Sequence, residues 1–171
     1  MNLQKFLLLS SLMCAFGCTG ADKLEVINPV AYVDPYIGTG GHGHTFLGVT
    51  VPFGAVQVGP NNINKGWDWC SGYHYSDSIV IGFSHLHLNG TGCSDTGDIL
   101  FMPYTGKVRT QPGTQQNPLS GYASYYSKDN ERALPAYYEV FLKTHRTKVE
   151  LTASDRVAFH RYTLPKDVEK Y

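Results

Sequence analysis

The sequence predicts an all-β fold, an antiparallel β-sandwich, and three observations support this class. The chain is rich in Gly (18 residues) and Tyr (12 residues), which favours strands and loops over helices. No segment sustains the apolar period of 3.6 residues that is typical of an amphipathic helix. Over residues 148–153, apolar and polar side chains alternate, which indicates a strand with one face in water.

The first part of the chain is expected to be a loop. Five glycines within residues 32–48 indicate an extended segment whose backbone passes close to other groups. A short strand is expected next, and a tryptophan-rich loop follows it. A longer strand should then place His85 and His87 on one face together with Phe83. The expected strands of this part are residues 55–58 and 78–88.

The remaining elements are a turn and four strands. Residues 89–92 read Asn-Gly-Thr-Gly, a strong turn signal. Residues 105–135 are polar and rich in Pro and Gly, and no strand is predicted there. The chain should close with a three-stranded meander, after which we expect the sandwich to be incomplete at the C-terminus. The expected strands of this part are residues 99–102, 137–143, 148–153 and 156–164.

Length and charge exclude some classes of protein. The 171 residues suggest about one domain. Lys and Arg (14 residues) balance Asp and Glu (14 residues) and are scattered along the chain, which argues against nucleic acid as a partner. The sequence also has no phosphate loop, dinucleotide fingerprint or Gly-x-Ser-x-Gly elbow.

Residues 1–17 are predicted to be a lipoprotein signal peptide, followed by a linker over 18–30. Lys5 supplies a positive charge, and an apolar run ends in small residues before Cys18. That run is too short for a membrane-spanning helix, which needs about 20 residues. We therefore expect Cys18 to carry a lipid that anchors the chain to a membrane, with ordinary signal-peptidase cleavage as the alternative. The predicted location is the periplasm or outer membrane of a Gram-negative bacterium.

Export makes a disulfide between Cys70 and Cys93 possible, because oxidising compartments preserve disulfides. Bridging needs the two Cα atoms within about 7 Å of each other. A thiol at Cys70 that lines a pocket is equally compatible with the sequence. The two alternatives stay open at this point.

Residues 66–75 contain both tryptophans of the chain, together with two tyrosines, an aspartate, a cysteine and a histidine. Such a mixture suits a sugar, which offers C–H faces to aromatic rings and hydroxyl groups to polar side chains. The alternative is a tryptophan-rich plug beneath a loop. Composition alone does not separate a pocket from a plug.

Metal and catalytic sites are weakly supported. His42 and His44, and likewise His85 and His87, have the spacing of a strand-borne metal pair that Cys70 or Cys93 could complete. No CxxC or HExxH motif accompanies them, so no metal site is predicted. Asp68, Asp95 and Asp98 could supply a carboxylate pair for glycoside hydrolysis. Asp95 and Asp98 follow a turn and are more typical of turn stabilisation, so no catalytic residue is predicted.

Several segments, taken together, resemble the N-terminal domain of glycoside hydrolase family 92, a family of bacterial exo-acting α-mannosidases. The likeness covers about residues 30–165 and departs from the usual pattern at Leu47 and Ala136, both loop positions. It is carried by YIGTGGHGHTF (36–46), VPFG (51–54), GWDWCSGYHYSD (66–77) and GFSHLHLNGTGC (82–93), and it continues at 98–100, 130–131, 135–138 and 159–162.

The resemblance implies a β-sandwich of the supersandwich type that packs against a much larger helical domain. Residues 31–171 would then be a partial N-terminal sandwich domain, truncated before the catalytic helical domain. In the family the reaction is calcium-dependent and inverting, here expected to be of α-1,2-mannosidase type. The catalytic acid, the catalytic base and most calcium contacts belong to the helical domain.

On this basis the chain is expected to contact a mannose-containing glycan but to be inactive alone, with the helical domain as its partner. A free-standing carbohydrate-binding lipoprotein and a structural remnant of a truncated gene are the alternatives. The residues expected around the terminal mannose are Trp67, Asp68, Trp69, Cys70, His85 and His87.

Overall fold

The computed structural model describes residues 27–90, 92–93 and 97–168. The chain divides into two units, residues 1–31 and 32–171. A short 3-10 turn, η2 (Pro29–Tyr32), lies where the first unit ends. The predicted signal peptide and Cys18 lie outside the described residues. Within the described part of the chain, no helix combines the length and apolarity that crossing a bilayer requires.

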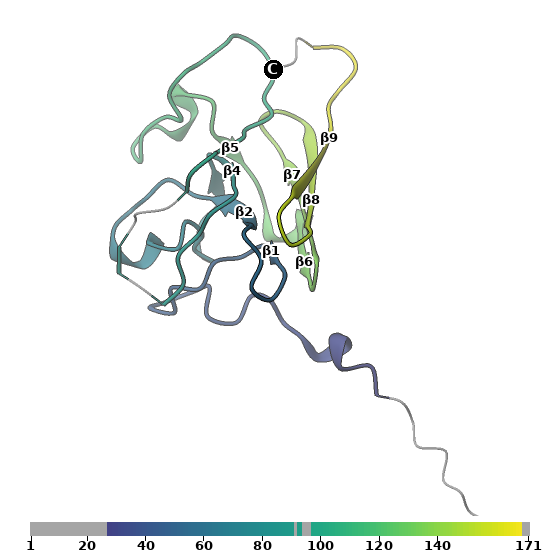
Figure 1. Ribbon diagram of the computed structural model, residues 1–171. Helices are drawn as coiled ribbons and strands as arrows, with labels where there is room; N and C mark the ends of the chain where they lie inside the picture. The colour runs from purple at the N-terminus through teal and green to yellow at the C-terminus, as the bar shows by residue number, and fades with distance from the viewer. Residues whose placement is uncertain (1–26, 91, 94–96, 169–171) are drawn as a thin grey trace, which may run out of the picture. The chain divides into compact units, whose positions relative to one another are not determined.

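The second unit is built from antiparallel β-sheets, so the all-β prediction is confirmed (Figure 1). Short 3-10 turns lie between the strands: η3 (Trp67–Trp69), η4 (Pro118–Ser120) and η5 (Lys128–Asn130). The described strands form a sheet of order β1-β2-β4, a pair β3-β5 and a meander β6-β7-β8-β9. Their bounds are β1 (Val49–Thr50), β2 (Gln57–Asn61), β3 (Ile79–Val80), β4 (Gly82–Ser84), β5 (Ser124–Tyr125), β6 (Glu131–Leu134), β7 (Tyr137–Leu142), β8 (Thr147–Ala153) and β9 (Ala158–Thr163).

The meander follows the alternation of its sequence. Val140 pairs with Val149, and their side chains lie in the core. Glu150, next along β8, pairs with Arg161 of β9, and the two form an ion pair. Apolar side chains therefore cover one face of the sheet and charged ones the other, as a half-buried antiparallel sheet requires. The strands predicted for this part of the chain are confirmed.

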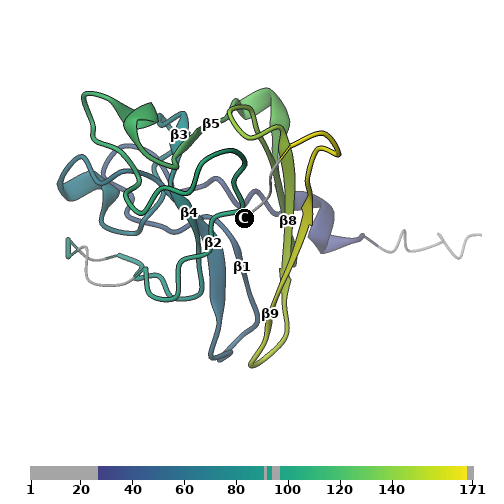
Figure 2. The same cartoon turned by 90° about the horizontal axis from the view of Figure 1, so that it is seen from above.

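Two layers enclose the core. The sheet β1-β2-β4 packs against the meander, with β1 and β2 both in contact with β8. Figure 2 shows the two layers side by side, β1, β2 and β4 in one and β8 and β9 in the other. Burying apolar side chains between two sheets is the main favourable term in such a fold. The fully buried side chains of the core include Leu47, Val49, Val58, Val80, Phe83, Tyr138, Val140, Leu142, Val149 and Leu151.

The single strand predicted over residues 78–88 is wrong. The chain changes sheets at Ile81, because β3 pairs with β5 whereas β4 pairs with β2. Gly82 makes this possible with φ +152°, where a Cβ would clash with Leu100 and with the carbonyl oxygen of Phe101. The strand then ends at Ser84.

Other boundaries also differ from the prediction. The strand expected over 55–58 lies at 57–61, and that expected over 99–102 is reduced to one bridge between Phe83 and Phe101. Ile99 has a positive φ of 55°, which interrupts an extended strand. Strands β1, β5 and β6 were not predicted, because β1 and β5 have two residues each and β6 begins inside a polar stretch.

Candidate functional site

Three glycine-rich loops meet around Trp67, and each carries predicted site residues or their neighbours. The N–H of Gly90 donates to the carbonyl oxygen of His44 at 2.8 Å. The N–H of Phe46 donates to Oδ1 of Asn89, also at 2.8 Å. Gly92 lies so close to Trp67 that a Cβ there would fall 2.1 Å from the indole nitrogen. The glycines thus allow these loops to approach one another.

Trp67 is an exposed ring at this meeting point. It begins the short turn η3, which Gly66 enters with φ 123°. Its side chain is 57% exposed. The ring of His44 meets the indole edge-on, with centroids 4.3 Å apart, and that of His42 lies 5.4 Å away. We call His42, His44, Trp67 and Asp68 the Trp67 cluster.

Asp68 is the charged member of the cluster. Nδ1 of His42 lies 2.6 Å from Oδ1 of Asp68, and Nε2 of His44 lies 3.4 Å from the same oxygen. The hydrogen bond from His42 is the largest cause that lowers the pKa of the Asp68 carboxyl below its ordinary value. Asp68 is therefore ionised at neutral pH and accepts hydrogen bonds.

Trp69 is fixed from several sides. Its indole N–H donates to Oδ2 of Asp77 at 2.8 Å, and its ring stacks on His74 with centroids 4.2 Å apart. The Lys65 ammonium lies 5.4 Å from the indole centroid and 2.8 Å from the same carboxylate oxygen. Asp77 is buried and also accepts the backbone N–H groups of residues 78 and 79. These contacts match the plug interpretation for Trp69.

Cys70 lies beside Trp69 at the wall of a pocket of about 400 Å³ with both polar and apolar lining residues. The structure has Cys70 and Cys93 as two thiols, the first buried and the second exposed, rather than as a disulfide. Burial raises the pKa of the Cys70 thiol, which keeps it protonated. The pocket is lined by Asn61, Asn62, Asn64, Trp69, Cys70, Gly72, Ile81, Gly97, Asp98 and Leu100.

His87 is buried behind this pocket. Its Nδ1 lies 2.8 Å from the carbonyl oxygen of Gln57, and its Nε2 lies 3.1 Å from Oδ1 of Asn61. Its ring stacks on Phe46, with centroids 5.1 Å apart. Burial lowers the pKa of His87 to about 4, so that the ring is neutral at physiological pH. A Cβ at Gly72 would lie 3.0 Å from the ring, which places His87 directly behind the tryptophan loop.

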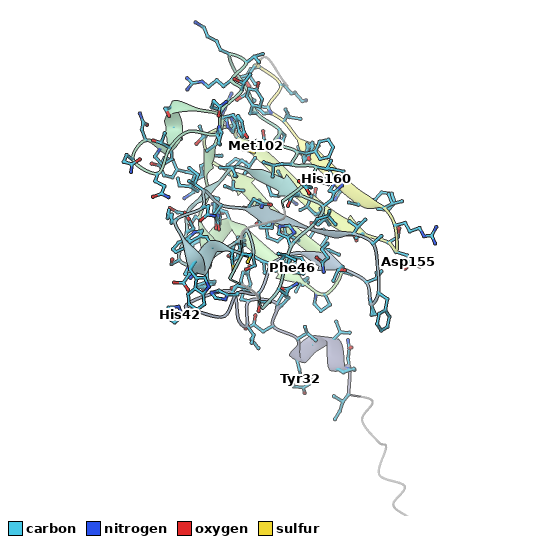
Figure 3. The ribbon with its side chains drawn as sticks, turned by 60° about the vertical axis from the view of Figure 1, so that its left-hand side comes forward. Tyr32, His42, Phe46, Met102, Asp155 and His160 are labelled. Atoms are coloured by element: carbon cyan, nitrogen blue, oxygen red, sulfur yellow. The ribbon has the colours of Figure 1, made fainter. Side chains whose placement is uncertain are left out.

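His85 does not share these surroundings. Its Nε2 lies 2.8 Å from Nε2 of His160, across the two layers, and its ring lies 5.3 Å from that of Phe101. The prediction that His85 and His87 share one face of a strand is therefore wrong, because β4 ends at Ser84. Figure 3 shows His42 and His160 well apart.

The predicted residues thus divide into three groups: Trp67 and Asp68 in the Trp67 cluster, Trp69 and Cys70 at the pocket with His87 behind it, and His85 apart. The sequence indicates only a weak metal pair at His42 and His44, whereas in the structure both rings lie against Trp67. The glycines beside both histidines were the available signal, because they indicate a loop that approaches other groups and not a strand that presents a metal pair. Asn61 and Asp77 were missed because an isolated polar residue in sequence carries no signal of its own.

Comparisons with known proteins agree on one family. The model of the glycosyl hydrolase family 92 N-terminal domain matches residues 32–171. A family GH92 α-mannosidase from Bacteroides thetaiotaomicron, solved in complex with mannoimidazole, is 43% identical with a TM-score of 0.76, over 80% of this chain and 18% of that chain. A second solved glycosyl hydrolase of family GH92 is 29% identical with a TM-score of 0.69, over 82% of this chain and 19% of that one.

An uncharacterized secreted glycosidase of Arthroderma benhamiae is 27% identical over 137 residues, which are 78% of this chain and 17% of that protein. The chain therefore spans less than a fifth of the length of these relatives.

Proposed function

Because this chain belongs to glycosyl hydrolase family 92, whose N-terminal domain it contains, we propose that it supplies substrate contacts to an exo-acting, inverting α-mannosidase. The substrate class is a mannose-containing glycan, of α-1,2 linkage by the family resemblance. The 43% identical α-mannosidase that was solved with mannoimidazole supports a mannose-like ligand.

The Trp67 cluster carries this proposal. An exposed indole beside an ionised carboxylate offers a pyranose what it needs: a flat apolar surface for its C–H face and an acceptor for its hydroxyls. Trp67 is 57% exposed, and Asp68 adjoins it in the same turn. Trp69, Cys70, His85 and His87 were also expected to contact substrate. We now assign Trp69 and His87 to support of the loop, with Cys70 at the pocket wall.

The charged member of the cluster, Asp68, does not fit the general acid of glycoside hydrolysis. Glycoside hydrolysis needs a general acid whose pKa is raised, so that it carries a proton at working pH. The pKa of Asp68 is lowered instead, by its hydrogen bond from His42. On the basis of the family resemblance, we propose that the catalytic acid and base come from a helical domain outside these 171 residues, which would be the partner of this one.

Calcium is proposed to bind outside the described residues. The ion takes six to eight oxygen ligands. Within residues 27–90, 92–93 and 97–168, no group of three or more His, Cys, Asp and Glu side chains has the arrangement to hold a metal ion. One oxygen of the Asp68 carboxylate is already hydrogen-bonded to the imidazoles of His42 and His44. These residues do not fit a calcium site.

We propose further that the protein is exported and anchored by a lipid on Cys18. The charged start, the short apolar run and the small residues before Cys18 support this proposal. The fungal relative is named a secreted glycosidase. The periplasm or outer membrane of a Gram-negative bacterium is the proposed location.

A chimera tests the functional proposal. Residues 32–171 would replace the matching segment of the Bacteroides thetaiotaomicron α-mannosidase, and mannose release from an α-mannoside would be measured with calcium present. We expect the 171-residue chain alone to be inactive and the chimera to be active. The matched control is the same enzyme with that segment deleted, which should also be inactive.

Mannose release by the 171-residue chain alone would contradict the assignment of catalysis to another domain. A folded but inactive chimera would favour the alternative that this chain is a structural remnant of a truncated gene. The exposure of Trp67 keeps one other function open, a free-standing carbohydrate-binding lipoprotein. Titration of the isolated chain with an α-mannoside distinguishes this binding protein from the N-terminal part of an enzyme. Tight binding in the absence of a helical domain would favour the free-standing binding protein.

A further inference from the structure

Two histidines join the two layers of the sandwich far from the Trp67 cluster. His85 follows β4 in one layer, and His160 lies on β9 in the other, where Figure 3 labels it. Their Nε2 atoms are 2.8 Å apart. Phe101 covers both rings, with centroid distances of 5.3 and 5.6 Å. Both histidines are half-buried, so solvent reaches the pair.

The spacing of the two nitrogens matches that of neighbouring ligands on one metal ion. Two metal–nitrogen bonds of about 2.0 Å that enclose an angle of about 90° place their nitrogens about 2.8 Å apart. Square-planar and tetragonal ions have this angle. Burial lowers the pKa of both imidazoles, that of His160 to about 4, so both rings are neutral at physiological pH, as metal ligands must be.

Tyr162 supports His160 from its other side. The Tyr162 hydroxyl lies 2.7 Å from Nδ1 of His160. When Nδ1–H donates to this hydroxyl, Nε2 of His160 carries the lone pair and is available as a ligand. Metal-binding histidines commonly donate their second N–H to such a partner, which fixes the tautomer and the orientation of the ring.

We propose that His85 and His160 form a two-imidazole site for a divalent late transition-metal ion of the Ni²⁺ or Cu²⁺ type. The ion would replace the hydrogen bond between the two Nε2 atoms, and the N–H of His85 would move to Nδ1 with no net change in protons. Among the described residues, no third His, Cys, Asp or Glu joins the pair. Water would fill the remaining positions, and the ion would tie β9 to the segment after β4.

Electron paramagnetic resonance of the 171-residue chain with one equivalent of Cu²⁺ tests the site. We expect coupling to two equatorial imidazole nitrogens in the wild type. His85→Ala and His160→Ala should each remove one nitrogen and weaken binding by about tenfold or more. His42→Ala is the matched control, because His42 is an exposed imidazole of the other cluster and its loss should leave the spectrum unchanged.

Thermal unfolding with Ni²⁺ gives a second readout. A metal that binds only the folded state raises the melting temperature, and the rise should vanish in His85→Ala and His160→Ala but remain in His42→Ala. A wild-type spectrum without two imidazole nitrogens would overturn the proposal even if a variant failed to fold. So would a spectrum that changes with His42→Ala and not with His160→Ala.

Discussion

Two tryptophans that are separated by a single residue have different surroundings. The Trp67 side chain is mostly exposed, with the ring of His44 edge-on to it and that of His42 tilted beside it, whereas the Trp69 indole N–H is held by the buried carboxylate of Asp77. The sequence places both in one loop, and the 3-10 turn separates them because successive side chains point in different directions. Position within the turn, rather than residue type, decides which ring can meet a ligand.

Trp69→Phe should destabilise the chain by about 1–3 kcal/mol, because it removes the donor to a buried acceptor. Lys65 still neutralises Asp77, so the lower half of this range is expected. Trp67→Phe should change the free energy of unfolding by less than about 0.5 kcal/mol, as exposed substitutions usually do. Urea unfolding of both variants measures this difference, and equal losses would show that both rings are structural.

The contribution of Asp68 to substrate binding should depend little on pH in the neutral and mildly acidic range. A carboxyl whose pKa is lowered in the folded protein stays ionised above its ordinary value of 3.8, and its contribution is lost only as the pH falls through the lowered pKa. In the active chimera, Asp68→Asn should therefore raise KM by the same factor from about pH 7 to about pH 5. If the ratio of the two KM values becomes smaller over this pH range, Asp68 titrates within the range, and the conclusion that its pKa is lowered is refuted.

At the scale of elements, a buried carboxylate connects the loop region to the meander. Glu131 of β6 accepts hydrogen bonds from the hydroxyls of Tyr73 and Tyr138 at 2.9 and 2.8 Å, and its partner ammonium is Lys128 at 2.9 Å. The Lys128 ammonium also lies 4.9 Å from the ring centroid of Tyr75. The segment that follows the tryptophan loop is thereby attached to the β5–β6 region.

Glu131→Ala should cost about 3 kcal/mol or more, because it leaves a partly buried ammonium and two buried hydroxyls without their acceptor. Glu139→Ala is the matched control. Glu139 lies on the outer face of the meander and pairs with the half-exposed Lys148 at 3.0 Å, so its loss should cost about 1 kcal/mol or less. Similar losses in the two variants, measured by urea unfolding, would contradict this role of Glu131.

The loop that contains Tyr104 and Tyr122 should loosen in mild acid. The N–H of Thr105 donates to Nδ1 of His145 at 3.3 Å, so Nε2 carries the hydrogen that the carbonyl oxygen of Tyr122 accepts at 2.8 Å. The bond from Thr105 requires the neutral ring, because only an unprotonated Nδ1 accepts a hydrogen bond, and burial lowers the pKa of His145 below its ordinary 6.5. As the pH falls below about 6.5, the unfolded chain takes up the proton first and stability is lost.

His145→Gln should therefore show a shallower fall in melting temperature than the wild type between about pH 6.5 and about pH 5. The other histidines with lowered pKa are present in both chains, so their effect cancels in the comparison. Parallel melting curves for the two chains over this range would refute the contribution of His145.

Strands whose apolar and polar residues alternate clearly could be predicted from the sequence. Strands that depend on contacts between residues far apart in the sequence could not. The meander could be predicted because its strands carry their own pattern of apolar and polar residues. The break at Ile81 could not, because it depends on Gly82 meeting Leu100 and on β3 finding its partner β5. In the same way composition could mark residues 66–75 as a candidate loop, whereas the split between His85 and His87 follows from where β4 ends.

For the whole molecule, mass spectrometry of the membrane fraction tests the proposed anchor. We expect a mature chain that begins at a lipid-modified Cys18. Cys18→Ser should then remain unprocessed by the lipoprotein pathway and leave the detergent phase. An unmodified mature chain that starts elsewhere would show ordinary signal-peptidase cleavage instead.

The central claim is that the family 92 domain contributes a sugar-binding surface at Trp67, while the catalytic carboxylates lie in another domain. Its most direct test is the turnover of an α-mannoside by the chimera with Trp67→Phe, measured together with thermal unfolding. We predict that kcat/KM falls by about tenfold or more, equivalent to about 1.4 kcal/mol of lost transition-state stabilisation, at an almost unchanged melting temperature. Unchanged turnover, or a joint collapse of turnover and melting temperature, would contradict the claim.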